Sequence, residues 1–152
     1  MTGKLNIPEI EQVLGEQLLG RIGCHSEGVT YIVPVSYAYN GEHIFVHAKE
    51  GMKLEMMRKN PHICFQTDTM KNMANWKSVI AWGIFEELKE KSEREKGLRC
   101  LLERRLPIAS SSTTHITPQW PFLPENLEDI GEVIFRIRIT EKTGRFENDQ
   151  ID

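Results

Sequence analysis

The sequence predicts a mainly β protein, an antiparallel barrel of six strands accompanied by a few helices. Three observations lead to this prediction. Segments of strand length are rich in β-branched and aromatic residues, Asn40-Gly41 is a strong hairpin signal between two of them, and residues 132–141 alternate apolar with polar side chains. Strands joined by turns, with few helical patterns between them, are typical of such barrels.

The expected elements alternate strands with three helices. The helices cover residues 8–17, 51–59 and 92–104, and the strands cover residues 18–24, 30–39, 43–47, 62–69, 76–88 and 132–141. Pro8 suits the first turn of a helix, and Asn60-Pro61 ends the second helix. Ser92 and Glu95 form a capping-box pattern at the start of the third helix.

Two strands carry residues that interrupt a regular ladder. Pro34 cannot donate a ladder hydrogen bond, so it marks an edge, a bulge or a break that faces a cofactor. Gly83 marks a candidate bulge in the strand 76–88. Three segments are predicted to lack regular structure: the loop 70–75, the stretch 107–124 around Trp120, and a frayed tail after Gly144.

Length and composition predict one soluble domain over residues 1–152. Hydrophobic residues make up 39% and charged residues 27%, as in ordinary globular proteins. A net charge of −3 without a basic tract argues against nucleic acid as a partner. No apolar run approaches the ~18 residues of a membrane span, and no secretory signal is expected. Three widely spaced cysteines fit reduced, mostly buried thiols, so the expected location is cytoplasmic.

The most informative segment is 43–65, which contains strand, loop, short helix and strand. Lys49 and Lys53 flank Gly51 where the helix begins. A helix N-terminus carries partial positive charge, so added cations are unfavourable there unless an anion lies nearby. The simplest anion is a phosphate held by helix N–H groups and a lysine ammonium. The alternative is that both lysines are solvated surface residues and Glu50 is an ordinary N-cap.

Two other segments are candidates for contacts with the same ligand. Trp76, Lys77 and Ser78 open a long strand and offer a cation and a hydroxyl to an anion; the alternative is an ordinary strand start. A planar ring system can lie along the strand 30–39 and take hydrogen bonds from the backbone where Pro34 interrupts the ladder. The alternative for that strand is simple core packing.

Metal binding and a nucleophilic site are not predicted. His43 and His47 share one strand face but lie about 13 Å apart at ~3.3 Å per residue, which is too far for one ion. His62 and His115 have no visible partner. The chain has neither a nucleophile elbow, nor a P-loop, nor a dinucleotide fingerprint. If the chain is an enzyme, an external cofactor does the chemistry.

Several motifs follow one another between residues 18 and 145. They are VPVSYAY, an Asn-Gly hairpin, IFVHAKEGMKLEMMRKNPHICFQTD, WKSVIAWGIFEEL and VIFRIRITEKTGR. In this order they resemble the pyridoxamine 5′-phosphate oxidase-like flavoproteins, in particular the branch of the nitroimidazole-resistance proteins. The resemblance implies a six-stranded split β-barrel that forms a homodimer, with two FMN molecules at the subunit interface.

The resemblance also implies which residues bind FMN. They are Val33, Pro34, Val35, Ser36, Tyr37, His47, Ala48, Lys49, Gly51, Lys53, Trp76, Lys77 and Ser78. Residues 33–37 would line the isoalloxazine, and residues 47 and 48 would border it. Lys49, Gly51 and Lys53 would hold the phosphate, and residues 76–78 would complete the site. Lys77 stands where relatives often have arginine, so a bidentate contact becomes a point charge.

The function implied by the resemblance is an FMN-dependent oxidoreductase. It would pass electrons from a nicotinamide or another reductant to a small acceptor, such as a nitroaromatic. His47 is the candidate for proton transfer, and its alternative is a structural role at a barrel end. Two other functions stay open: a non-catalytic flavin-binding protein, and the same fold binding a deazaflavin or haem, with His62 or His115 as the axial ligand of haem.

Overall fold

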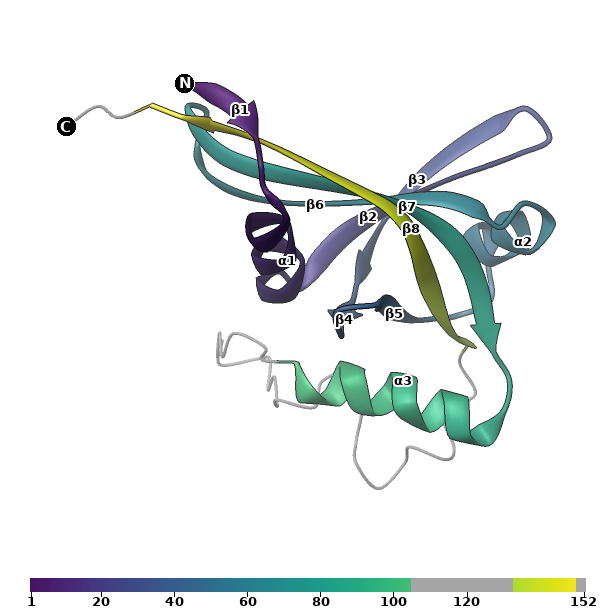
Figure 1. Cartoon of the computed structure of the whole chain (residues 1–152). Helices are drawn as coiled ribbons and strands as arrows, with labels where there is room; N and C mark the ends of the chain where they lie inside the picture. Colours follow the sequence, from purple (N-terminus) through teal and green to yellow (C-terminus); the bar gives the residue numbers. More distant parts are fainter. Residues whose placement is uncertain (105–132, 150–152) are drawn as a thin grey trace, which may run out of the picture.

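The computed structural model describes residues 1–104 and 133–149, which form one curled antiparallel sheet with three helices around it (Figure 1). Along the chain the elements are β1 (Thr2–Lys4), α1 (Ile7–Glu16), β2 (Leu19–Ser26), β3 (Val29–Ser36), β4 (Ala38–Tyr39), β5 (His43–Ala48), α2 (Met52–Lys59), β6 (His62–Asn72), β7 (Asn75–Leu88), α3 (Lys91–Glu103) and β8 (Val133–Asn148). The stretch predicted to be irregular, 107–124 with His115 and Trp120, lies outside the described residues.

The sheet has eight strands in the order β3-β2-β6-β7-β8-β5-β4, and β1 pairs with β8. Its inner side is packed with apolar side chains, and the largest fully buried ones include Tyr37, Phe65 and Phe135. The predicted class, a mainly β split barrel with few helices, is confirmed. The strand count is eight instead of six because β4 separates from β3 at Tyr37 and because β1 was not expected.

The helices cover the outside of the barrel. Asn6 caps α1 and forms a capping box with Glu9, and α1 buries an apolar face of Ile10, Val13 and Leu14. Figure 1 shows α3 crossing the barrel end beside β4 and β5, where it buries a second apolar cluster. Within the described part of the chain, no helix is long and apolar enough to cross a membrane.

The predicted start of α3 is wrong. The helix begins at Lys91 with Glu90 as its N-cap, and no side chain caps it. Ser92 therefore lies inside the first turn, where its hydroxyl cannot occupy the capping position. What holds α3 is its apolar face, since Leu98 and Leu101 are buried in the cluster beneath it. Tertiary packing fixed this helix start, and the local capping pattern did not.

β6, β7 and β8 extend beyond the barrel as a three-stranded arm (Figure 1). The loop predicted over 70–75 is wrong, because Asn72 pairs with Asn75 across a two-residue turn. The frayed tail predicted after Gly144 is also wrong, because β8 continues to Asn148 and pairs with both β7 and β1. Backbone hydrogen bonds hold the arm, so its polar side chains gave no sign of strand structure.

A bulge lies at the predicted position along the ladder, but its extra residue belongs to the strand opposite Gly83. Trp82 pairs with Glu141 and Gly83 pairs with Ile139, so Thr140 is the additional residue and lies on β8. The Thr140 hydroxyl donates a hydrogen bond to the Trp82 carbonyl at 3.1 Å. The extra residue bends the sheet at this point, where the arm joins the barrel.

Gly83→Ala is expected to lower the free energy of unfolding by about 2 kcal/mol. An added Cβ would lie 2.5 Å from the Arg138 carbonyl oxygen and 2.7 Å from the Ile137 side chain. The matched control is Gly15→Ala in α1, where a Cβ meets nothing within 4 Å and helix propensity adds up to ~1 kcal/mol. Urea unfolding measures both changes, and equal stability of the two variants would contradict the close approach at the bulge.

Candidate functional site

The segment 49–53, called the lysine loop below, joins the end of β5 to the first turn of α2. Lys49 and Gly51 are exposed, and Lys53 is half-buried. Gly51 is the N-cap residue and supplies no side-chain cap, so the first N–H groups of α2 lack that partner. Among the described residues, neither lysine side chain makes a hydrogen bond or an ion pair. This donor set fits a phosphate.

Glu50 does not cap α2, because the N-cap residue is Gly51, so the N-cap part of the alternative for the lysine loop is wrong. Its carboxylate instead accepts two hydrogen bonds from the Arg58 guanidinium, at 2.8 and 2.7 Å. The same guanidinium donates to Glu87 on β7, at 3.2 and 2.7 Å. No local pattern in the sequence indicates this role of Arg58, because its partner Glu87 lies on a distant strand.

β3 is the terminal strand of the sheet, where a proline is tolerated, so the edge interpretation of Pro34 holds. Val33 and Val35 pair with Ile22 and Gly20 and face the core side of the sheet. Pro34 is exposed on the outer side. β3 also comes into contact with β5, which leads into the lysine loop. The predicted ring-lining strand therefore contacts the strand that leads into the predicted phosphate loop.

Tyr37 belongs to the core more than to an open pocket. Its side chain is fully buried, its hydroxyl donates to the Leu14 carbonyl at 2.7 Å, and burial raises its pKa to about 12. Arg104, at the end of α3, donates to the Ser36 hydroxyl at 2.5 Å and to the Tyr37 carbonyl at 3.2 Å. Arg104 thus connects α3 with the predicted cofactor strand, and its own burial lowers its pKa. The sequence held no local signal for this contact.

Trp76, Lys77 and Ser78 lie on the arm. The Trp76 indole donates to Glu147 at 3.1 Å, and the Ser78 hydroxyl accepts from Gln66 at 3.1 Å. Trp76 and Lys77 line an open groove of about 570 Å³ beside α1. Lys77 is half-buried, and within the described residues its ammonium makes no hydrogen bond or ion pair. The cation and the hydroxyl that the sequence predicts as ligand contacts thus lie on the arm, and the hydroxyl already accepts a hydrogen bond from Gln66.

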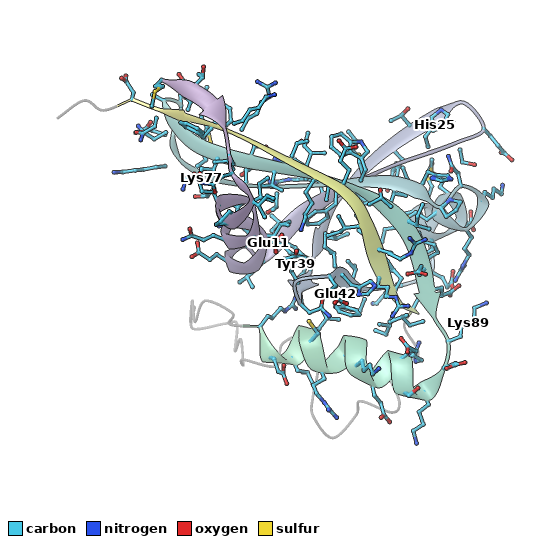
Figure 2. The ribbon with its side chains drawn as sticks, in the orientation of Figure 1. Glu11, His25, Tyr39, Glu42, Lys77 and Lys89 are labelled. Atoms are coloured by element: carbon cyan, nitrogen blue, oxygen red, sulfur yellow. The ribbon has the colours of Figure 1, made fainter. Side chains whose placement is uncertain are left out.

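One chain does not bring the arm residues to the lysine loop. His47 pairs with Ile134 on β8, which pairs with Leu88 on β7. Lys77 lies eleven residues before Leu88, which is about 35 Å along the strand at ~3.3 Å per residue. Figure 2 places Lys77 beside α1, at the end of the molecule opposite α2 in Figure 1. The predicted site is therefore divided into two halves within one chain.

His47 and Ala48 are the last residues of β5. His47 is half-buried and Ala48 is buried, directly before the lysine loop. His43 lies at the other end of the same strand, with Nδ1 4.0 Å from Glu42. Within residues 1–104 and 133–149, no group of three His, Cys, Asp or Glu side chains is arranged to hold a metal ion. His62 is exposed, which is unlike the apolar setting that a haem ligand needs.

The curled antiparallel sheet with its few helices defines a class, the split β-barrels. The family model of the pyridoxamine 5′-phosphate oxidases matches residues 7–146. The chain therefore belongs to the pyridoxamine 5′-phosphate oxidase family. This confirms the family that the sequence motifs indicated.

Individual relatives agree with this assignment. An uncharacterised protein of Rhizobium meliloti is 28% identical over 145 residues, covering 90% of this chain and 89% of the relative. A FAD-binding protein of Mesorhizobium loti has a similar structure, with a TM-score of 0.73, 27% identity and 98% coverage of both chains. A candidate 5-nitroimidazole antibiotic resistance protein of Bacteroides thetaiotaomicron has a TM-score of 0.71 at 16% identity, covering 96% of this chain and 87% of that one. At that identity the likeness shows the fold alone.

Proposed function

We propose that this protein is an FMN-dependent oxidoreductase that passes electrons from a nicotinamide or another reductant to a small acceptor, such as a nitroaromatic. The observation that carries the proposal is the lysine loop. Its two ammonium groups make no hydrogen bond or ion pair among the described residues, and they flank a helix start without a side-chain cap. The structurally similar FAD-binding protein of Mesorhizobium loti supports a flavin as the ligand.

We assign the following roles to the residues of this chain. Lys53 and Lys49 bind the phosphate, together with the N–H groups at the start of α2. The outer side of β3 around Pro34 borders the ring and helps to exclude water from it. His47, which ends β5 beside this loop, is the candidate to hold a proton near the ring. The bound flavin would supply the electron-transfer chemistry itself.

The proposed assembly is a homodimer with the flavin at the subunit interface. A second copy would bring its Trp76, Lys77 and Ser78 to the lysine loop, which one chain does not do. A suitable interface is the outer face of the sheet, where Ile32 and Trp82 share one rung and Ile80 lies beside Trp82. All three side chains are exposed, by 70%, 40% and 37% respectively. An apolar stripe of this kind is typical of an interaction surface.

The expected location is the cytoplasm. Cys24, Cys64 and Cys100 are all free thiols, which is consistent with a reducing compartment. Cys24 is buried and serves packing, as buried free cysteines usually do, whereas Cys64 and Cys100 are half-buried.

The purified protein is expected to be yellow, with the absorption bands of an oxidised flavin. Heat release of the ligand followed by chromatography identifies FMN, FAD or riboflavin, since each has its own retention time. Anaerobic addition of NADH or NADPH should bleach the flavin, and a nitroaromatic should restore it within one turnover. Flavin that binds but is not reduced would favour the non-catalytic alternative, and a red-brown protein with a Soret band would contradict the proposal.

A further inference from the structure

Arg58 holds together three elements around the lysine loop. It lies in the last turn of α2, and its guanidinium donates to both carboxylate oxygens of Glu50, inside that loop. It also donates to both carboxylate oxygens of Glu87, near the end of β7. These four charge-assisted hydrogen bonds are called the Arg58 network below. They fix the direction of the contact, unlike the single contacts of most surface ion pairs.

The Arg58 network determines where the negative charge of Glu50 lies. Glu50 stands between Lys49 and Gly51, one residue before the N-cap of α2. A carboxylate near a helix N-terminus is attracted to the free N–H groups and would compete there with an anionic ligand. Both oxygens of Glu50 are instead bound by Arg58, and this guanidinium lowers the pKa of the Glu50 carboxyl. The carboxylate therefore stays ionised and is bound by Arg58, whose single positive charge it shares with Glu87.

The second carboxylate, that of Glu87, attaches the Arg58 network to the barrel. Glu87 is half-buried, and it belongs to a strand that pairs with β6 and β8 along most of its length. Without this anchor, Arg58 and Glu50 would connect only α2 with its own preceding loop. With it, the loop has a fixed position on β7. An exposed loop thereby gains a rigid attachment close to the proposed phosphate.

We propose that Arg58 is the positioning residue of the phosphate site, which selects phosphorylated flavins by holding Glu50 away from the start of α2. This inference rests on the proposed function. Arg58 contacts no ligand in this proposal and acts only through Glu50 and Glu87. Its contribution should therefore appear with FMN, which carries the phosphate, and be absent with riboflavin, which has the same ring and ribityl chain.

The test measures dissociation constants of FMN and riboflavin by fluorescence titration of the flavin-free protein. Arg58→Met is expected to weaken FMN binding by about fivefold to tenfold and to leave riboflavin binding unchanged, because the freed Glu50 carboxylate repels only the phosphate. Glu50→Gln alone should bind FMN as well as the wild type or better. The double variant R58M/E50Q should recover most of the lost FMN affinity, since the repelling charge is gone.

The matched control is Lys59→Met, which removes one positive charge from the next residue of the same helix. Lys59 is exposed and pairs only weakly with Glu27, at 3.4 Å, so FMN binding should stay within about twofold of the wild type. If Arg58→Met does not fold, Arg58→Lys replaces it in the cycle. Lysine keeps the charge but loses the bidentate geometry, so a smaller loss specific to FMN is expected.

The outcomes separate the two proposals. If the wild type binds FMN no tighter than riboflavin, the phosphate site itself is wrong and the role of Arg58 falls with it. If the wild type prefers FMN but the Arg58 variant loses both ligands equally, Arg58 is only a structural residue. Failure of Glu50→Gln to restore FMN binding in the Arg58 variant would also overturn the inference, because the repelling carboxylate would then not be the cause.

Discussion

Trp82→Asp is expected to produce a monomer that no longer retains flavin. Trp82 is 40% exposed on the outer face of the sheet, so the barrel of one chain does not depend on its burial. At a subunit interface the same position would be enclosed, and a carboxylate there would lose its hydration without gaining a partner. Burying an unpaired charge costs several kcal/mol, which is enough to dissociate a dimer of ordinary affinity.

Loss of flavin should accompany loss of the dimer because the proposed site is divided. The lysine loop lies at one end of the molecule, and Lys77 lies on the arm at the other end (Figure 2). Only a second copy can supply the arm residues to the loop, so a monomer would hold half of a site. Half of the contacts, open to water, should not retain a flavin through purification.

Light scattering and absorbance measured on the same chromatographic peak give mass and flavin content together. The control is Ile7→Asp, since Ile7 is 72% exposed on α1 and does not lie on the sheet face. That variant should remain dimeric and yellow. A wild-type monomer that carries FMN would contradict the dimer itself, and a dimeric, yellow Trp82→Asp protein would show that another face is used.

Sequence reasoning predicted those elements whose signals are local. The hairpin at Asn40-Gly41 follows from turn chemistry, and Asn40 accepts hydrogen bonds from the amides of Glu42 and His43 as that turn requires. The bulge at Gly83 follows from one glycine within an otherwise regular strand. The end of α2 at Asn60-Pro61 also follows from adjacent residues.

Elements held by distant partners were not predictable in this way. The last residues of β8 are polar, but they form a strand because they pair with β7 and with Thr2 at the other end of the chain. Single-sequence patterns carry no information about such pairings. The prediction of where α3 starts was wrong for the same reason, because apolar packing beneath the helix outweighs the Ser92 capping pattern.

The same distinction between local signals and distant partners applies to the candidate site. Lys49, Gly51 and Lys53 are close in sequence, and their shared location at a helix start follows from the sequence alone. Arg58 and Arg104 were missed because Glu87 and Ser36, their partners, are far from them in the chain. The separation of the arm from the lysine loop was likewise invisible, since it depends on the register of three paired strands.

Lys53→Ala is expected to weaken FMN binding by about tenfold to a hundredfold, which corresponds to roughly 1.5–3 kcal/mol for a lost charge-assisted hydrogen bond. Lys53 is half-buried in the first turn of α2, whereas Lys49 is exposed, so a phosphate bound beside Lys53 would be partly shielded from water. Partial desolvation strengthens the attraction of Lys53 to a phosphate. Lys49→Ala should therefore have the smaller effect, closer to the ~1 kcal/mol of an exposed charge.

The ligand pair FMN and riboflavin isolates the phosphate contact. Riboflavin affinity should not change in Lys53→Ala, because the ring and the ribityl chain keep their contacts. Lys89→Ala is the control for removing one surface charge; Lys89 lies in the link between β7 and α3, and Figure 2 shows its side chain directed away from the barrel. High salt should weaken FMN binding to the wild type but have little further effect on Lys53→Ala. An unchanged FMN titration curve for Lys53→Ala would remove the lysine loop from the site, because no other half-buried ammonium in the first turn of α2 is available to replace it.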